Sequence, residues 1–111
     1  MARRPNIKEI VQAACDVYGV TPEYVNQPNR KREVIWIRQS IHYWARKLTR
    51  LPLREIGRIV GKRDHATVIW SVKVVSGEYK LYEDRKIFID DIELKLQERG
   101  FRTEKYKEYE Q

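Results

Sequence analysis

The stretch "LREIGRIVGKRDHATVIWSVKVV", residues 53–75, decides the fold. Apolar residues recur at helical spacing from 52 to 60, and Gly61 ends that run. Asp64 is a typical helix-capping residue and precedes a second apolar run over 64–79. The expected inward residues of this second run are Val68, Val72 and Val75. A short helix, a tight turn and a longer helix predict a helix-turn-helix.

Helical periodicity also covers most of the remaining chain. The further expected helices are 6–18, 33–49 and 83–98, with one short helical turn at Thr21 and Pro22. The fold class that follows is all-α: a compact helical domain with a helix-turn-helix over residues 1–98. A charged C-terminal tail over 99–111 has no motif, and we expect it to be solvated and poorly ordered.

The composition and the absence of long apolar runs indicate the cellular compartment of the protein. The chain has 111 residues, of which 35% are charged and 41% hydrophobic. The single cysteine, Cys15, excludes an intrachain disulfide, and its small apolar neighbours predict a buried position. The opening residues lack the apolar run of a signal peptide, and no stretch is long enough for a membrane span. We therefore expect a cytoplasmic protein, in a bacterial or phage-infected cell, that does not bind membranes.

The basic residues are concentrated in one segment. From Arg30 to Asp64 there are eleven basic and three acidic residues, a net charge of +8, whereas the whole chain carries +7. A solvated helix face usually mixes both signs. One-sided charge centred on a helix-turn-helix is typical of a protein that binds nucleic acid.

An enzyme is the weakest interpretation of the histidine in this stretch. Asp64 and His65 are adjacent, so on a helix they point about 100° apart and cannot form a base with its orienting carboxylate. No phosphate-binding glycine loop is present, and Asp64, His65 and His42 lack the spacing of metal ligands. We expect no catalysis, no metal, no cofactor and no small-molecule substrate.

The start of the helix over 64–79 carries side chains that are suited to contact DNA bases and phosphates. Free N–H groups at a helix start favour phosphate, and first-turn side chains can enter a major groove. Asp64 can accept from cytosine, the side chains of His65, Ala66 and Thr67 can meet thymine methyls, and Arg63 can reach phosphate or guanine. A plainer interpretation is that Asp64 only caps the helix and its neighbours only face solvent.

Residues 53–75 also resemble the C-terminal DNA-binding domain of the bacterial replication initiator DnaA. At the corresponding place that family carries the signature Gly-Gly-Arg-Asp-His-Thr-Thr-Val. The similarity extends upstream to "NRKREVIWIRQSIHYWARKLT", residues 29–49, which resembles the basic loop and long helix of that family. It covers roughly residues 5–98. The resemblance implies a helix-turn-helix of the Trp-repressor-like, DnaA C-terminal type.

The resemblance also implies roles for individual residues. Arg63, Asp64, His65 and Thr67 match positions that contact the major groove and the adjoining backbone, and Ala66 matches a base-reading position. Arg30 matches an arginine that enters the minor groove. Arg32, Arg38, Gln39 and Arg46 match positions that hold the flanking DNA. By their charge and place we expect further backbone contacts from Lys31, Arg54, Arg58, Lys62 and Lys73.

Several residues depart from the family pattern. Ala66 replaces a threonine and Lys62 replaces a glycine of the signature, while Pro28 and Asn29 make the basic loop less basic. Trp36 and Trp70 replace smaller or polar residues, and we expect Trp70 to pack rather than to stack on bases. The chain also has no room for the nucleotide-binding region of the initiator, so we expect a free-standing box-binding domain.

The function predicted from the sequence is selective binding of double-stranded DNA at a DnaA-box-like site, as a monomer per site, in replication or transcription control. Two alternatives remain. One is a protein-interaction module whose basic face docks an acidic partner, and the other is an RNA-binding protein that uses its aromatic residues.

Overall fold

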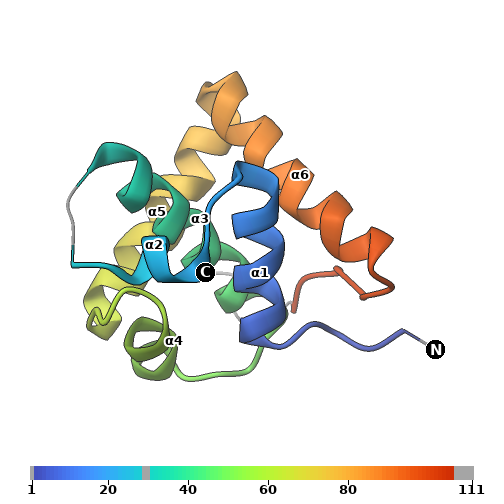
Figure 1. Ribbon diagram of the computed structural model, residues 1–111, viewed down its shortest axis with the longest axis horizontal. Helices are drawn as coiled ribbons and strands as arrows, with labels where there is room; N and C mark the ends of the chain where they lie inside the picture. The colour runs from blue at the N-terminus through green and yellow to red at the C-terminus, as the bar shows by residue number, and fades with distance from the viewer. Residues whose placement is uncertain (1, 29–30, 107–111) are drawn as a thin grey trace.

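The computed structural model describes residues 2–28 and 31–106, and this part of the chain forms six helices and no strand (Figure 1). The helices are α1 (Ile7–Tyr18), α2 (Pro22–Asn26), α3 (Arg32–Leu48), α4 (Leu53–Ile59), α5 (His65–Leu81) and α6 (Glu83–Glu98). The all-α, helix-turn-helix prediction is therefore confirmed. The helix bounds differ from the expected ones by no more than two residues.

Local sequence signals explain where the first helices begin and end. Asn6 caps α1 in a capping box, in which its side chain accepts from the Glu9 N–H and the Glu9 carboxylate accepts from the Asn6 N–H. Gly19 ends α1 in the left-handed conformation that favours glycine. Thr21 caps α2, with Pro22 in its first turn.

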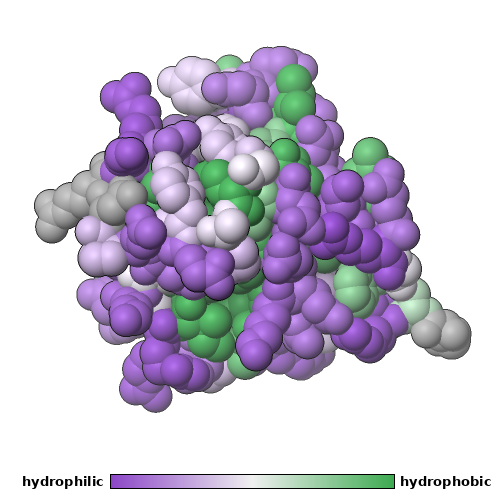
Figure 2. All heavy atoms as spheres, viewed as in Figure 1, coloured by the Kyte–Doolittle hydropathy of each residue, from purple (hydrophilic) through white to green (hydrophobic). Residues whose placement is uncertain are grey.

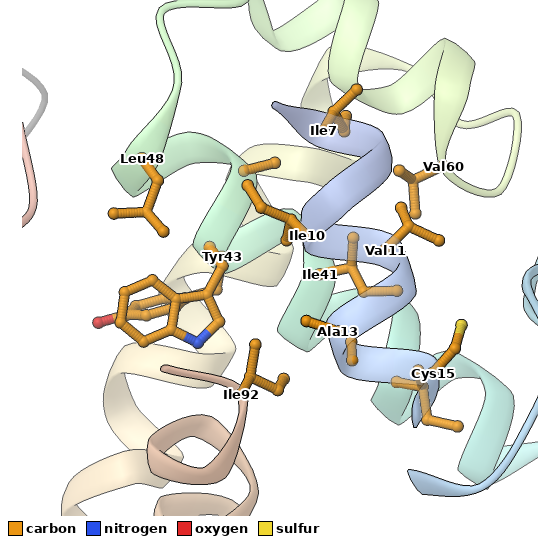
Figure 3. Close-up of a cluster of buried hydrophobic side chains, with 14 of the residues drawn as sticks. Ile7, Ile10, Val11, Ala13, Cys15, Ile41, Tyr43, Leu48, Val60 and Ile92 are labelled. Carbon is orange, nitrogen blue, oxygen red and sulfur yellow. The ribbon is translucent and has the colours of Figure 1, made fainter. Parts of the chain in front are cut away.

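A large part of the core lies between α1, α3 and α6 (Figure 3), and α4 and α5 add further buried residues. Ile7, Ile10 and Ala13 of α1 meet Ile41 and Leu48 of α3, and Ile92 of α6 closes the cluster. Cys15 is buried there, as expected. Trp44 is also buried, and its indole N–H donates to the Ile89 carbonyl over 3.1 Å, so its polar atom is satisfied.

The segment after α6 packs against the domain, at least as far as Tyr106, rather than forming the solvated tail that we expected. The Arg102 N–H donates to the Arg3 carbonyl over 2.9 Å, and the Tyr106 N–H donates to the Lys47 carbonyl over 2.9 Å. Thr103 is only 7% exposed, and the Tyr106 ring lies beneath the Arg4 and Arg50 guanidinium groups. The sequence did not predict this docking, because each contact joins residues far apart in the chain.

Hydrophilic side chains cover most of the face seen in Figure 2. Some large apolar side chains remain at the surface, among them Leu81 at the end of α5 and Ile87 and Leu94 on α6. Ile87 is half exposed, whereas Phe88 beside it is buried. Across the described residues, no helix combines the length and apolar character that crossing a bilayer requires.

Candidate nucleic-acid interface

The turn between α4 and α5 brings two stretches of backbone together at Gly57. The Arg63 N–H donates to the Gly57 carbonyl over 2.8 Å. A Cβ atom on Gly57 would lie 2.1 Å from the Arg63 carbonyl oxygen, far inside van der Waals contact. Glycine at this position therefore sets how closely α4 approaches the start of α5.

Two consecutive residues of this turn adopt left-handed backbone conformations. The φ angle is +83° at Gly61 and +52° at Lys62. The Gly61 N–H donates to Asn26 Oδ1 over 2.9 Å, which ties the turn to the end of α2. Lys62 is exposed, so its side chain fits, but a side chain at this φ carries backbone strain that glycine would not.

Asp64 caps α5, as the sequence predicted. Its Oδ1 atom accepts from both the N–H and the hydroxyl of Thr67, each over 2.9 Å. These hydrogen bonds, the one from the Thr67 backbone first, hold the pKa of the Asp64 carboxyl below its usual range. The cap therefore keeps a carboxylate at the start of α5 and fixes the hydroxyl of Thr67 against it.

The outer surface of α5 combines small, polar and aromatic side chains. His65 and Ala66 are exposed in its first turn. Trp70, one turn later, is 62% exposed, so our expectation that it packs is wrong. Ile69 beside it is exposed as well, and together the two side chains give α5 an apolar surface next to Ala66.

A hollow separates α3 from the first two turns of α5. Ile35 and Gln39 line it from α3, and Thr67 and Trp70 line it from α5. Arg63 joins them from the turn, and Arg38, His42 and Ser71 also line this hollow, so every lining residue except Ile35 carries a polar or aromatic group. A second hollow farther along the two helices is lined by Arg46 of α3 and by Ile69 and Lys73 of α5, among others.

The remaining expected contacts do not line these two hollows. Arg54 and Arg58 are exposed on α4, where Arg58 pairs with Glu55. Lys31 and Arg32 are exposed at the start of α3. Arg30, the expected minor-groove arginine, lies outside the described residues.

Arg38 does not fit the expected role. Its side chain is 3% exposed, Nε donates to the Val25 carbonyl over 2.6 Å, and Nη2 donates to the Gln27 carbonyl. Burial also lowers the pKa of this guanidinium. Arg38 thus anchors the end of α2 to α3, and only the small part of its side chain that lines the first hollow is open to a DNA phosphate. Its spacing of four from Val34 and three from Ile41, both buried, is the sequence signal that places it on the inward side.

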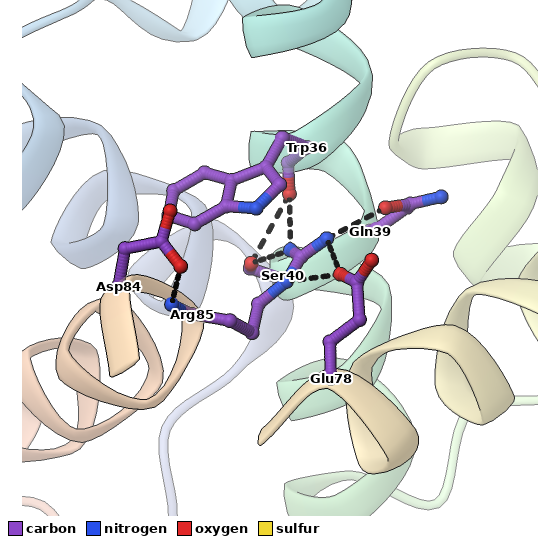
Figure 4. A network of polar contacts seen from close by, with 6 residues as sticks. All are labelled: Trp36, Gln39, Ser40, Glu78, Asp84 and Arg85. Carbon is purple, nitrogen blue, oxygen red and sulfur yellow. Dashed lines mark hydrogen bonds and ion pairs between the residues drawn. The ribbon is translucent and has the colours of Figure 1, made fainter. Parts of the chain in front are cut away.

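Gln39 is half-buried and belongs to a polar network between three helices (Figure 4). Arg85 of α6 inserts its guanidinium between α3 and α5, where it contacts Gln39, Ser40 and Glu78. The Arg85 guanidinium also lies over the Trp36 ring, 4.5 Å from its centroid. Sequence reasoning missed this arginine, because nothing near Arg85 in the chain predicts its partners.

His42 serves packing rather than chemistry. Its Nε2 lies 3.0 Å from the Val60 carbonyl oxygen and its Nδ1 lies 2.9 Å from the Ser71 hydroxyl. A carbonyl only accepts, so Nε2 carries the proton and Nδ1 accepts from Ser71. Burial, with some repulsion from Arg38 and Arg63, lowers the pKa of His42 to about 4. The ring is therefore neutral and joins α3 to α5 and to the residue after α4.

A family model described as "Bacterial dnaA protein helix-turn-helix" matches residues 7–75, more than half of the chain. The chain belongs to this family. The match runs from α1 through most of α5 and includes the turn, the Asp64 cap and the first hollow, whereas α6 and the docked segment after it lie beyond its end.

Relatives of this DnaA-family chain carry the name of a replication initiator. "Chromosomal replication initiator protein DnaA" of Thermus thermophilus is 42% identical over 67 residues, 60% of this chain and 15% of the relative. The proteins of the same name from Thermodesulfovibrio yellowstonii and Flavobacterium psychrophilum are 36% identical over 90 residues and 34% identical over 94 residues. These alignments cover 80% and 85% of this chain but 20% of each relative. The chain thus spans about one-fifth or less of the length of these DnaA proteins.

Proposed function

We propose that the protein binds double-stranded DNA, with α5 in the major groove as the recognition helix. The observation that carries this proposal is the one-sided charge of the helix-turn-helix segment, which has eleven basic and three acidic residues from Arg30 to Asp64. Arg38 is buried, but cations at the start of α3, on α4 and in the turn are exposed. Such a surface favours a polyanion whose charges follow a regular backbone.

The DNA backbone would be held by cations around α5. Lys62 is exposed in the turn, and Arg54 and Arg58 are exposed on α4. Farther along α5, Arg46 and Lys73 share the second hollow. Lys31, Arg32 and Gln39 of α3 complete the proposed set. Contacts of this kind orient the protein on the duplex without reading its sequence.

The first turn of α5 would read base edges. His65 and Ala66 are exposed there, and Arg63 and Thr67 border the adjoining hollow. Asp64 has a role in capping α5, so its contact with a base would be made by the same carboxylate that holds the helix start. We further propose that Arg30 enters the adjacent minor groove. Ala66 and Trp70 together would replace part of the apolar contact that a threonine supplies in the family signature.

The target we propose is a DnaA-box-like site, bound by one protomer per site. Membership of the DnaA helix-turn-helix family supports replication as the process, with transcription control as the second candidate. Binding would then take place in the cytoplasm, on the nucleoid or on phage DNA.

Fluorescence anisotropy tests the proposal with two labelled duplexes, one with a DnaA-type box and one with the same bases scrambled. Each is titrated at low and at near-physiological salt, and an RNA duplex of the box sequence is the matched control. We expect binding to both DNA duplexes at low salt, a preference for the box at higher salt, and weaker binding to RNA.

Each other result of the anisotropy experiment would overturn a different part of the proposal. Equal, salt-sensitive binding to both DNA duplexes would retain DNA binding and overturn the box as the target. Equal binding to DNA and RNA would overturn the major groove as the contact surface, because A-form RNA does not admit a helix there. Absence of binding to any duplex would overturn the proposal as a whole.

A further inference from the structure

The guanidinium of Arg85 has all five of its N–H donors occupied. Nε donates to Glu78 Oε1 over 2.9 Å, and Nη1 donates to the Trp36 carbonyl over 2.9 Å and to the Ser40 hydroxyl over 2.8 Å. Nη2 donates to Glu78 Oε1 over 2.6 Å and to Gln39 Oε1 over 2.9 Å. The Arg85 side chain is 1% exposed, so these partners are held away from solvent on at least one side.

This geometry decides which way the Gln39 amide points. A guanidinium has donors and no acceptor, so the Gln39 atom facing Arg85 is the oxygen. Its Nε2 then points away from Arg85, as Figure 4 shows. Among the described residues Nε2 has no protein acceptor, and it is not a buried unsatisfied atom. Gln39 also borders the hollow with Arg63, Thr67 and Trp70.

We infer that Arg85 is a positioning residue for DNA binding. By holding the Gln39 oxygen, it presents the Gln39 NH₂ group at the edge of the α3–α5 hollow as a fixed donor to a DNA phosphate. This inference rests on the proposed function. A glutamine without this partner could also turn its acceptor oxygen toward the phosphate, whereas the orientation set by Arg85 removes that unfavourable state. The last helix, α6, thus takes part in DNA binding through a residue that does not touch DNA.

A double-mutant cycle on DNA affinity tests the coupling. The dissociation constants of the wild-type protein, Arg85→Lys, Gln39→Ala and the double variant are measured with both DNA duplexes, after urea denaturation shows each variant to be folded. We expect Gln39→Ala to weaken binding about five- to tenfold on either duplex, because it removes one phosphate contact. Arg85→Lys should weaken binding in the wild-type background and have no further effect in the Gln39→Ala background. Equal effects of Arg85→Lys in both backgrounds would mean a purely structural role and would overturn the inference.

A second comparison does not depend on the buried arginine tolerating substitution. Gln39→Met keeps the length of the side chain without a hydrogen bond, and Gln39→Glu keeps the acceptor for Arg85 but places a charged oxygen where the NH₂ group was. We expect affinity to fall in the order wild type, Gln39→Met, Gln39→Glu. If Gln39→Met binds as well as the wild type does, the inference fails while DNA binding stands. If the wild type binds no duplex, both fail.

Discussion

Lys62 occupies a backbone conformation that glycine adopts at little cost. Its φ of +52° places a side chain in the left-handed region, where a non-glycine residue is strained by roughly 1–2 kcal/mol. We predict that Lys62→Gly raises the free energy of unfolding by about 1 kcal/mol and weakens DNA binding on all sequences alike, since it removes one cation. Urea denaturation and anisotropy measure the two effects. Lys62→Ala is the control, because it removes the charge and keeps the strain; equal stability of the two variants would contradict the prediction.

A substitution of His65 tests base recognition without disturbing the fold, whereas a substitution of Asp64 does not. Asp64→Ala would lose the α5 cap as well as any base contact, whereas His65 is exposed and makes no cap. We predict that His65→Ala lowers the preference for the box over the scrambled duplex by about 1–3 kcal/mol and leaves unfolding unchanged. Arg54→Ala, on the exposed side of α4, should weaken both duplexes equally. If His65→Ala weakens both duplexes equally too, His65 contacts only the backbone.

At the scale of elements, the approach of α4 to α5 depends on one missing side chain. A Cβ atom on Gly57 would overlap the Arg63 carbonyl oxygen, which belongs to the backbone and cannot rotate away. We predict that Gly57→Ala lowers the free energy of unfolding by at least about 3 kcal/mol. Gly77→Ala is the matched control, because Gly77 lies in α5 with nothing near its would-be Cβ, and it should stabilise by about 0.5–1 kcal/mol. Similar effects of the two substitutions in urea denaturation would refute the close approach.

The contact between α3 and α5 through His42 should make stability depend on pH. The folded protein holds this ring neutral with a pKa of about 4, whereas an unfolded histidine titrates near about 6.5. As pH falls below 6.5 the unfolded state gains a proton that the folded state does not, so stability is lost. We predict a decrease of about 2 kcal/mol in the free energy of unfolding from pH 7 to pH 5. His42→Leu should abolish this decrease over the same range, and persistence of the slope in that variant would assign it to other groups.

The sequence predicted the elements better than their contacts. Apolar spacing, Asp64 and Gly61 were enough for the helix-turn-helix, because those signals are local. Arg38 and Arg85 were not predictable from charge, since burial of a guanidinium depends on carbonyl and carboxylate groups supplied by other helices. Trp70 was misjudged for the same reason: its exposure depends on what α3 places opposite it. Which of the interface residues contact DNA stays a prediction.

At the scale of the whole molecule, the segment that follows α6 packs against the helical domain. Thr103 is buried, its hydroxyl donates to Glu93 and accepts from Gln97, and Phe101 packs against the core. We predict that deleting residues 99–111 lowers the free energy of unfolding by at least about 2 kcal/mol, since it re-exposes apolar core surface. Arg102→Ala, which removes only an exposed side chain of this segment, should change it by less than about 0.5 kcal/mol. Unchanged urea denaturation after the deletion would show that the docking contributes nothing to stability.

The hydrogen bond from Arg102 to Arg3 also fixes where the molecule can be tethered. It brings the first described residues beside the last ones, and in Figure 1 the blue segment before α1 extends away from the turn before α5, along the long axis. A dye, a surface linker or a fused domain joined to the N-terminus would therefore be held at one pole of the molecule, while the other pole stays open to a duplex. A single attachment point suits single-molecule experiments, because the tether and the DNA would not compete for the same surface.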